Sequence, residues 1–508
     1  MLAEPLCNRL SIAVFTAVLA TDIGIDTVVC QLALVQQGFA LDLSDNHGNT
    51  GNLLPKTKYI FAPFIFIMQN LWLSQVVDDK KILSELKGGN IKTVTRDNRC
   101  ILCRGAKLLC GRSSCPVMVR FYFQAKSRPL MEKLTLDGSS PPSVFIGRIG
   151  YPFVSVGPML PPVHGDTSFL DTPELWQGKT IEEIVDFRSQ LVRGKHRVHV
   201  KDLEKNRIIE LTREIALSKT PAEVDVEFFK KPSGALVLDE EVQPYGPSAP
   251  MKRLNLTSMK TDHKIERAFS DTDLKAAEAV TILYSKEVLV SRIQRAFSAG
   301  LFGIGKNRKF VPTRWSITAV DSIISRNMMD EVKTFPLINE FRVYEHIALD
   351  NRWIILMIPE YWSYEQMEAW YPKTTWNPNS ENTWIISDWE GFDGRTTYAL
   401  TGGCYYSTRL GIAEHLAKER RQAAVITFRE IHPGYILPLG VWHTRESIRE
   451  ALKHEPNKFN TLEGALKHIS SKLEIPLKNW IKNTHLLRNF LYQKKLLDFA
   501  ANSKNRIF

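Results

Sequence analysis

The sequence predicts an α+β fold with two mixed α/β units, preceded by a small knuckle built on four cysteines. Short apolar runs punctuated by Gly and Pro predict strands between residues 141 and 238, and helices follow them. After Phe335, strands alternate with helices, which indicates a mixed sheet with helices on at least one face. Four of the seven Cys lie within sixteen residues, ahead of both units. At 508 residues, the chain is long enough for two or three domains.

Residues 1–81 differ from the rest and are expected to form an atypical, low-charge N-terminal extension. Only eight of the first 77 residues are charged, whereas the whole chain is 24% charged. The uncharged stretch 59–77 is long enough to cross a bilayer, but Pro63 and several Gln, Asn and Ser residues weaken that interpretation. A signal peptide is disfavoured because the start lacks a basic leader. We interpret this region as an idiosyncratic or mis-started extension before a domain that begins near Ile82.

Residues 82–135 are expected to form a metal-binding knuckle with a basic region. Cys100, Cys103, Cys110 and Cys115 have a spacing typical of a tetrathiolate metal site rather than of a disulfide framework. Four sulfurs in a closed tetrahedron suit structural zinc, which is the cofactor that we expect. An iron–sulfur cluster is the rival, favoured slightly by the proline after Cys115. Reduced, unligated thiols are the third alternative.

The predicted zinc knuckle lies in a strongly basic stretch. From Lys92 to Arg128, nine residues are Lys or Arg and only Asp97 is acidic. A rigid cationic surface of this kind most commonly binds phosphate backbones. The neighbouring Phe-Tyr-Phe at 121–123 could stack on unpaired bases, although the alternation of apolar residues favours a buried strand face for both Phe.

Residues 136–335 are expected to form the first α+β domain. Segment 141–158 predicts two short strands around a tight turn, because its apolar residues are punctuated by Gly and Pro. Within the turn, Arg148 and bare backbone N–H groups could face a phosphate, although the Gly spacing is no dinucleotide fingerprint. Residues 224–228 and 235–238 predict further strands, and residues 274–302 predict helices.

A second candidate phosphate ligand, Arg314, lies where a helix is predicted to begin. Pro312 and Trp315 precede this helix, and Ser316 could cap it. Arg314 would then lie near the positive end of the helix dipole, where an anion is favoured. Equally, Arg314 could simply pack beside Trp315.

Residues 336–485 are expected to form the second α+β domain. Residues 341–347 and 353–358 predict a hairpin, residues 407–421 and 446–453 predict helices, and residues 423–428 and 435–442 predict strands. Asp388, Glu390 and Asp393 could hold a divalent cation, which gives an alternative function as a metal-dependent nuclease or phosphodiesterase. A solvated polar turn explains these acids more simply, so no catalytic residue is assigned.

Residues 486–508 are expected to form a C-terminal clamp-binding helix and tail. Gln493, Leu496 and Phe499 follow the pattern Gln-x-x-aliphatic-x-x-aromatic, with which one helical turn presents two apolar side chains on one edge. Peptides of this pattern, the PIP motif, dock on the DNA polymerase sliding clamp. Many of them have a second aromatic residue where this chain has Ala500, so we expect clamp binding to be weaker by about 1–2 kcal/mol. The alternative is an ordinary amphipathic last helix.

The overall charge agrees with a polyanionic partner without requiring one. The chain has 66 Lys and Arg against 55 Asp and Glu, a formal net charge of +11. We therefore expect DNA as a partner and no membrane. An RNA-binding accessory protein is a weaker alternative.

In the order of its parts, the chain resembles the archaeal NreA family of DNA repair proteins. The resemblance covers residues 82–508 and rests on separate segments: the four-cysteine knuckle, Gly147–Pro152, Val311–Ser316 and the C-terminal peptide. It implies a cytoplasmic protein of archaeal type that acts in the response to DNA damage and binds the sliding clamp. Whether such a protein also breaks a bond does not follow from the resemblance.

Overall fold

The computed structural model describes residues 133–234 and 242–492, together with Cys103, residues 107–111 and Cys115. The region from 133 to 492 contains two six-stranded sheets, and both belong to one compact unit, Thr95–Phe508. Each sheet combines parallel and antiparallel strand pairs, and helices pack against both, so the predicted α+β class with two mixed units is confirmed. No helix in the described part of the chain is long and apolar enough to cross a membrane.

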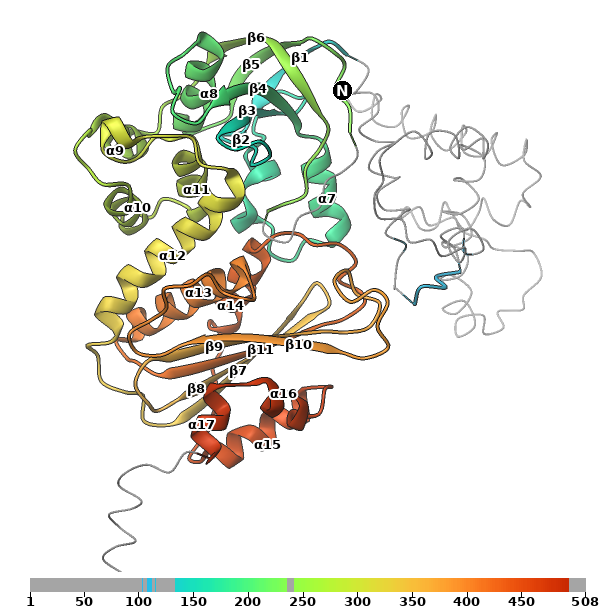
Figure 1. Cartoon of the computed structure of the whole chain (residues 1–508), viewed down its shortest axis with the longest axis vertical. Helices are drawn as coiled ribbons and strands as arrows, with labels where there is room; N and C mark the ends of the chain where they lie inside the picture. The colour runs from blue at the N-terminus through green and yellow to red at the C-terminus, as the bar shows by residue number, and fades with distance from the viewer. Residues whose placement is uncertain (1–102, 104–106, 112–114, 116–132, 235–241, 493–508) are drawn as a thin grey trace, which may run out of the picture. The chain divides into compact units, whose positions relative to one another are not determined.

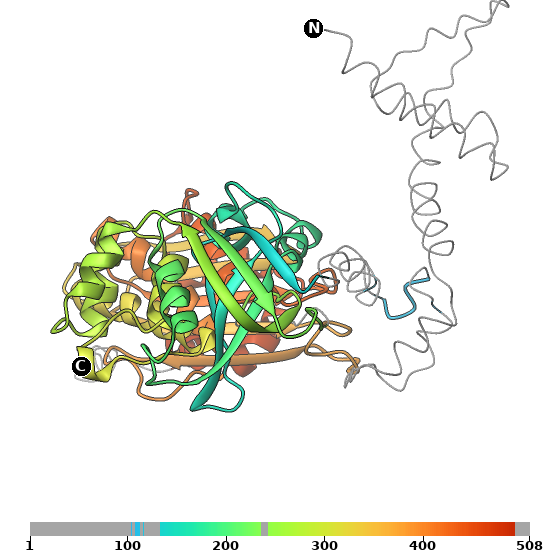
Figure 2. The same ribbon diagram turned by 90° about the horizontal axis from the view of Figure 1, so that it is seen from above.

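The first sheet is built from strands between residues 135 and 258. Its strands are β1 (Thr135–Ser140), β2 (Val144–Ile146), β3 (Phe153–Leu160), β4 (Val192–His199), β5 (Ala222–Phe228) and β6 (Ser248–Ser258). Their spatial order is β1-β5-β6-β4-β3-β2, and β4 runs parallel to β6. These strands lie side by side, in cyan and green, in Figure 2. The two strands predicted within 141–158 and the strand at 224–228 are confirmed as β2, β3 and β5.

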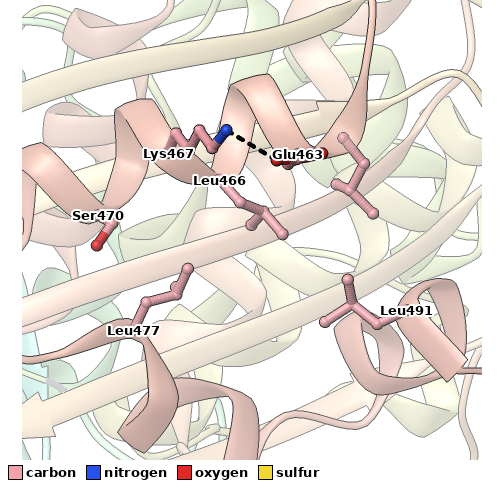
Figure 3. A pocket seen from close by; sticks show the side chains of 7 residues that line it. Glu463, Leu466, Lys467, Ser470, Leu477 and Leu491 are labelled. Atoms are coloured by element: carbon pink, nitrogen blue, oxygen red, sulfur yellow. Dashed lines mark ion pairs between the residues drawn. The ribbon is translucent and has the colours of Figure 1, made fainter.

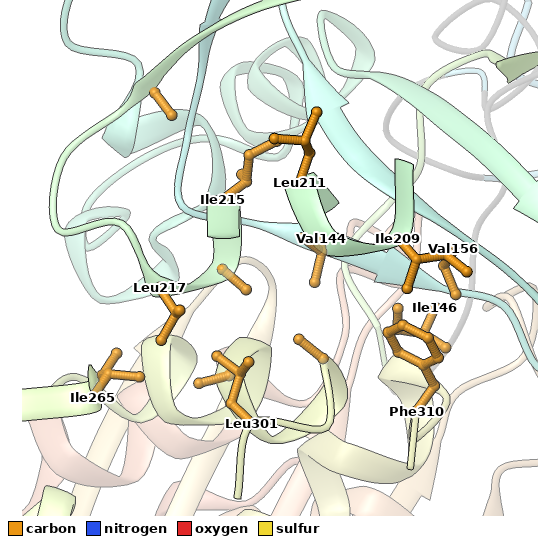
Figure 4. Close-up of a cluster of buried hydrophobic side chains, with 14 of the residues drawn as sticks. Val144, Ile146, Val156, Ile209, Leu211, Ile215, Leu217, Ile265, Leu301 and Phe310 are labelled. Carbon is orange, nitrogen blue, oxygen red and sulfur yellow. The ribbon is translucent and has the colours of Figure 1, made fainter. Parts of the chain in front are cut away.

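Between residues 181 and 332 the structure describes six helices, and all but the first of them contribute to the first hydrophobic core. They are α7 (Ile181–Ser189), α8 (Arg207–Leu217), α9 (His263–Ser270), α10 (Ala276–Ser285), α11 (Val290–Ser298) and α12 (Thr313–Val332), with short 3-10 turns at Ser168–Asp171, Pro173–Leu175 and Gly305–Asn307. Figure 4 shows Ile209 and Ile215 of α8 near Val144 and Val156 of the sheet. The Asn206 side chain caps α8 by accepting the Ile209 N–H at 3.1 Å.

The second sheet lies between residues 341 and 459. Its strands are β7 (Phe341–Ala348), β8 (Asn351–Ile358), β9 (Ser363–Trp370), β10 (Trp384–Glu390), β11 (Ala424–Ile431) and β12 (Asn457–Phe459), in the order β10-β9-β11-β8-β7-β12. Helices α13 (Gly403–Glu419) and α14 (Trp442–Ala451) lie on one face, and α15 (Leu462–Lys472), α16 (Leu477–Asn483) and α17 (Leu486–Tyr492) lie on the other (Figure 1). Buried apolar clusters fill both layers.

Two local predictions are wrong. Residues 435–441 form an irregular buried segment instead of a strand, because Pro438 has no N–H to donate and Gly440 has a positive φ of 96°. Ser316 does not cap α12, since the helix already begins at Thr313 and the Ser316 hydroxyl donates to the Thr313 carbonyl at 2.9 Å. The strand predicted at 235–238 lies outside the described residues.

Candidate nucleic-acid interface

The two segments predicted to hold phosphate ligands lie side by side. The β2–β3 turn (residues 147–152) and the start of α12 meet where the Ile146 N–H donates to the Thr313 hydroxyl at 2.9 Å. The rings of Tyr151 and Trp315 touch across this junction, with centroids 5.0 Å apart and planes inclined at 56°. The exposed Tyr151 and Trp315, 164 positions apart in the sequence, thus meet above a buried hydrogen bond between the same two segments.

Backbone hydrogen bonds hold the turn in a fixed conformation. Gly147 N–H donates to the Ser155 carbonyl at 2.8 Å, and Phe153 N–H donates to the Gly150 carbonyl at 2.9 Å. Gly150 has a φ of 84°, and a Cβ there would lie only 3.0 Å from the Arg197 guanidinium. This glycine therefore lets the turn rest directly on an arginine of β4.

Four large apolar side chains of this surface are exposed to solvent. The exposed fraction is 87% for Ile149, 43% for Tyr151, 51% for Phe153 and 45% for Trp315. Phe153 is steadied by an edge contact with the His199 ring, whose centroid is 5.2 Å away. A cluster of exposed apolar side chains on a folded protein commonly indicates a binding site.

Strand β4 carries basic residues on the sheet face that it shares with Phe153. Val198 is buried in the core, so the alternating Arg193, Lys195, Arg197 and His199 share the opposite face. The Arg193 guanidinium carbon lies 4.7 Å from the ring centroids of both Phe145 and Tyr245, and burial lowers the pKa of Arg193 to about 10. Burial, and then repulsion by Arg193 and Lys230, lowers the pKa of Lys195. Arg197 is exposed.

The segments that meet at this surface contain no acidic residue. Residues 138–165, 192–201 and 303–320 together have nine Lys and Arg and neither Asp nor Glu. Strand β4 pairs with β3, and the Phe310 N–H donates to the Val200 carbonyl at 2.8 Å, which brings the third segment alongside. We call residues 147–153, 195–201 and 309–315 the hairpin–helix surface. Its composition matches that of a phosphate-binding face.

The two arginines that were predicted as phosphate ligands differ in their exposure to solvent. Arg148 is exposed at the tip of the turn, whereas Arg314 is half-buried and already has an interaction partner. Arg197 was not singled out from the sequence. The alternation of basic residues at 193, 195 and 197 was the signal that could have found it, once β4 was recognised as a strand.

The acidic cluster proposed as a cation site is engaged by arginines. Asp388 pairs with Arg395 at 2.8 Å, and the buried Glu390 pairs with Arg409 at 2.6 Å. Burial opposes ionisation of Asp388, but hydrogen bonds from Arg395 and from the backbone N–H groups of Leu400 and Trp389 lower its pKa. Among the residues that the structure describes, no three His, Cys, Asp or Glu side chains are grouped to hold a metal ion. The geometry gives no support to metal-dependent hydrolysis at this place.

Three of the four predicted zinc ligands are described, and Cys100 lies outside the described residues. Cys103 is buried, Cys115 is half-buried and Cys110 is exposed. The Leu109 N–H donates to the Cys103 sulfur at 3.4 Å, where Leu108 has a φ of 48° and Gly111 a φ of 72°. Backbone N–H groups aimed at sulfur fit a thiolate ligand. The zinc site itself stays a prediction.

The predicted clamp peptide begins just beyond a firmly anchored helix. Residues 493–508, with Gln493, Leu496, Phe499 and Ala500, lie outside the described residues. Before them, the buried Glu365 of β9 accepts three hydrogen bonds at 2.5–2.8 Å from Thr484, His485 and Leu486, and so caps α17. Leu491 also lines a shallow apolar groove of about 320 Å³ between α15 and α16 (Figure 3). Glu365 therefore fixes the start of α17, the last helix in the described part of the chain.

Comparisons with known proteins match two family domains, and the boundary between them falls within the second sheet, after β9. Residues 109–377 match the family domain described as "Archaeal Nre, N-terminal", and residues 390–499 match "Archaeal Nre, C-terminal". "DNA repair protein NreB" of Archaeoglobus fulgidus is 42% identical over 390 residues, which cover 77% of this chain and 97% of the relative. "DNA repair protein NreA" of the same organism is 36% identical, over 74% of this chain and 94% of the relative.

A more distant relative extends the comparison. "DNA repair protein NreA" of Haloferax volcanii is 30% identical over 388 residues, which cover 74% of this chain and 92% of the relative. No solved structure matches the chain. The resemblance inferred from separate sequence motifs is confirmed over most of the chain, and the chain belongs to the archaeal Nre family.

Proposed function

We propose that this chain acts in DNA repair, that it binds DNA through the hairpin–helix surface, and that its C-terminal peptide recruits it to the DNA polymerase sliding clamp. The relatives are named as DNA repair proteins, which supports the first part. The observation that carries the proposal is the convergence of three acid-free, basic segments on one exposed face. Such a face attracts the phosphate backbone by charge and releases its counterions.

DNA binding at this face is tested by removing two exposed charges. The variant Arg148→Gln/Arg197→Gln should weaken DNA binding and lower the slope of log affinity against log salt by roughly one for each phosphate that the variant no longer neutralises. The matched control is Lys478→Gln/Lys482→Gln, two exposed charges on α16. Equal effects of the two double variants would mean that only overall charge matters, which would contradict the proposed face.

Recruitment to the clamp is supported by the peptide pattern and by the anchored helix that precedes it. Titration of purified sliding clamp with the full chain should show binding that disappears in Leu496→Ala/Phe499→Ala. Ile507→Ala removes a similar apolar side chain from the same tail and should bind like the unchanged chain. Ala500→Phe should tighten binding about tenfold, because the added ring buries more apolar area in the clamp pocket. Unchanged binding by the double variant would end this part of the proposal.

Structural zinc at Cys100, Cys103, Cys110 and Cys115 belongs to the same proposal. When bound, the ion would cross-link the knuckle and hold its basic side chains in place. Metal analysis of the purified chain should find one zinc per molecule, and Cys103→Ser should lose it. If the analysis finds iron instead and the protein absorbs visible light, the four cysteines hold an iron–sulfur cluster and the zinc assignment is wrong.

A further inference from the structure

We propose that the hairpin–helix surface binds unpaired nucleotides of single-stranded DNA, with bases stacked on Tyr151, Phe153 and Trp315 and phosphates held by Arg148, Lys195 and Arg197. This inference rests on the proposed DNA-binding function and specifies the form of DNA. Charge alone attracts single strands and duplex alike. The aromatic side chains are what distinguish them.

Exposure of these aromatic rings to water is unfavourable in free energy unless a ligand covers them. Tyr151 and Trp315 touch each other, yet each keeps more than two fifths of its surface exposed. Phe153 is half exposed although it lies in a regular strand, where neighbouring side chains could have covered it. An aromatic ring exposed to water lacks the favourable free energy of burial. A ligand that stacks on the ring buries it and so provides that free energy.

The faces of bases are free only where the strands are apart. In a duplex, each base is covered above and below by its neighbours, so a side chain reaches only the edges and the backbone. Unpaired bases offer their faces, and aromatic side chains stack on them with little preference for sequence. A surface with three exposed rings within two neighbouring segments therefore fits a single strand.

The cations lie where the backbone of such a strand would run. Alternate residues of a β-strand are about 7 Å apart, so Lys195 and Arg197 form a row along β4. That row leads to His199, which touches the Phe153 ring at 5.2 Å between centroids. Arg148 lies in the same turn as Tyr151. Charges on one side and rings on the other are the arrangement that single-strand-binding grooves use.

The experiment compares fluorescence anisotropy of one labelled oligonucleotide, single-stranded and annealed, with the full chain and its variants. Trp315→Ala and Tyr151→Ala should each weaken single-strand binding roughly tenfold and leave duplex binding within twofold. Trp315→Phe and Tyr151→Phe keep a ring and should bind nearly as well as the unchanged chain. Trp384→Ala is the matched control, since Trp384 of β10 is 51% exposed and outside the surface.

The outcomes separate this inference from the proposed function. If Arg148→Gln/Arg197→Gln weakens binding but Trp315→Ala does not, DNA binds this face without stacking and only the present inference fails. If neither change matters more than its control, DNA does not bind here and the proposed function loses its surface as well. Tighter binding of duplex, or of single-stranded RNA of the same sequence, would also overturn the assignment.

Discussion

At the residue scale, the side chain of Asp171 connects several elements, although no sequence pattern predicts this role. Asp171 is buried, and it accepts hydrogen bonds from Ser143 and Arg188 and two at 2.8 Å from Arg295. These partners come from α7, α11 and the β1–β2 connection, so one carboxylate joins three elements. No local sequence pattern around residue 171 predicts these contacts, because the partner residues are distant in the sequence.

Replacing Asp171 should destabilise the fold strongly. Asp171→Asn leaves two buried guanidinium groups without their counter-charge, and we expect the free energy of unfolding to fall by about 3–5 kcal/mol. Denaturant titration followed by tryptophan fluorescence measures this. Glu182→Gln, an exposed change on α7, should have almost no effect. A small loss for Asp171→Asn would show that the arginines find other partners.

The same carboxylate predicts part of the pH dependence of stability. Burial alone would raise the pKa of Asp171, but attraction by Arg188 and Arg295 outweighs burial and lowers it. Because the folded pKa lies below the unfolded one, the stabilisation is complete above the unfolded value and is lost as the pH falls through the folded value. Asp171→Asn should therefore show a shallower loss of stability in acid than the unchanged chain.

At the element scale, a single buried acid caps α17, whose Leu486 and Leu487 also pack in the core. Glu365 caps the helix through the backbone N–H groups of His485 and Leu486 and through the Thr484 hydroxyl. Glu365→Ala should release α16 and α17 from the sheet, since three donors lose their acceptor. Hydrogen exchange at residues 484–487 should accelerate at least tenfold while β11 stays protected. Glu381→Ala, an exposed loop change, is the control, and unchanged exchange would mean that apolar packing alone holds α17.

Helices and strands with a strong local sequence pattern could be predicted, whereas the packing of these elements against one another could not. Gly and Pro around residues 144–158 predict the β2–β3 hairpin, and Pro312 marks the start of α12 within a few residues. The contact between Tyr151 and Trp315 depends on how the sheet packs on the helices, which no local pattern encodes. For the same reason, Arg148 and Arg314 could be singled out separately, while Arg197 became visible only on the folded strand.

At the scale of the whole molecule, α12 joins the two sheets. Val320 and Ile324 belong to the core of the first sheet, whereas Met329 and Val332 belong to that of the second. Asp321 of the same helix accepts hydrogen bonds from Arg445 of α14 at 3.0 and 3.1 Å. The hairpin–helix surface at the start of α12 is thus connected through one helix to the second sheet.

The most direct measurement of where DNA binds is photo-cross-linking of the full chain to a single-stranded oligonucleotide with photoreactive bases, followed by peptide mapping. Cross-links are expected within residues 147–153, 195–201 and 309–315, and they should disappear in competition with unlabelled single strands. Cross-links confined to other parts of the chain, such as the basic stretch 92–128 or the acids around Asp388, would contradict the proposed interface.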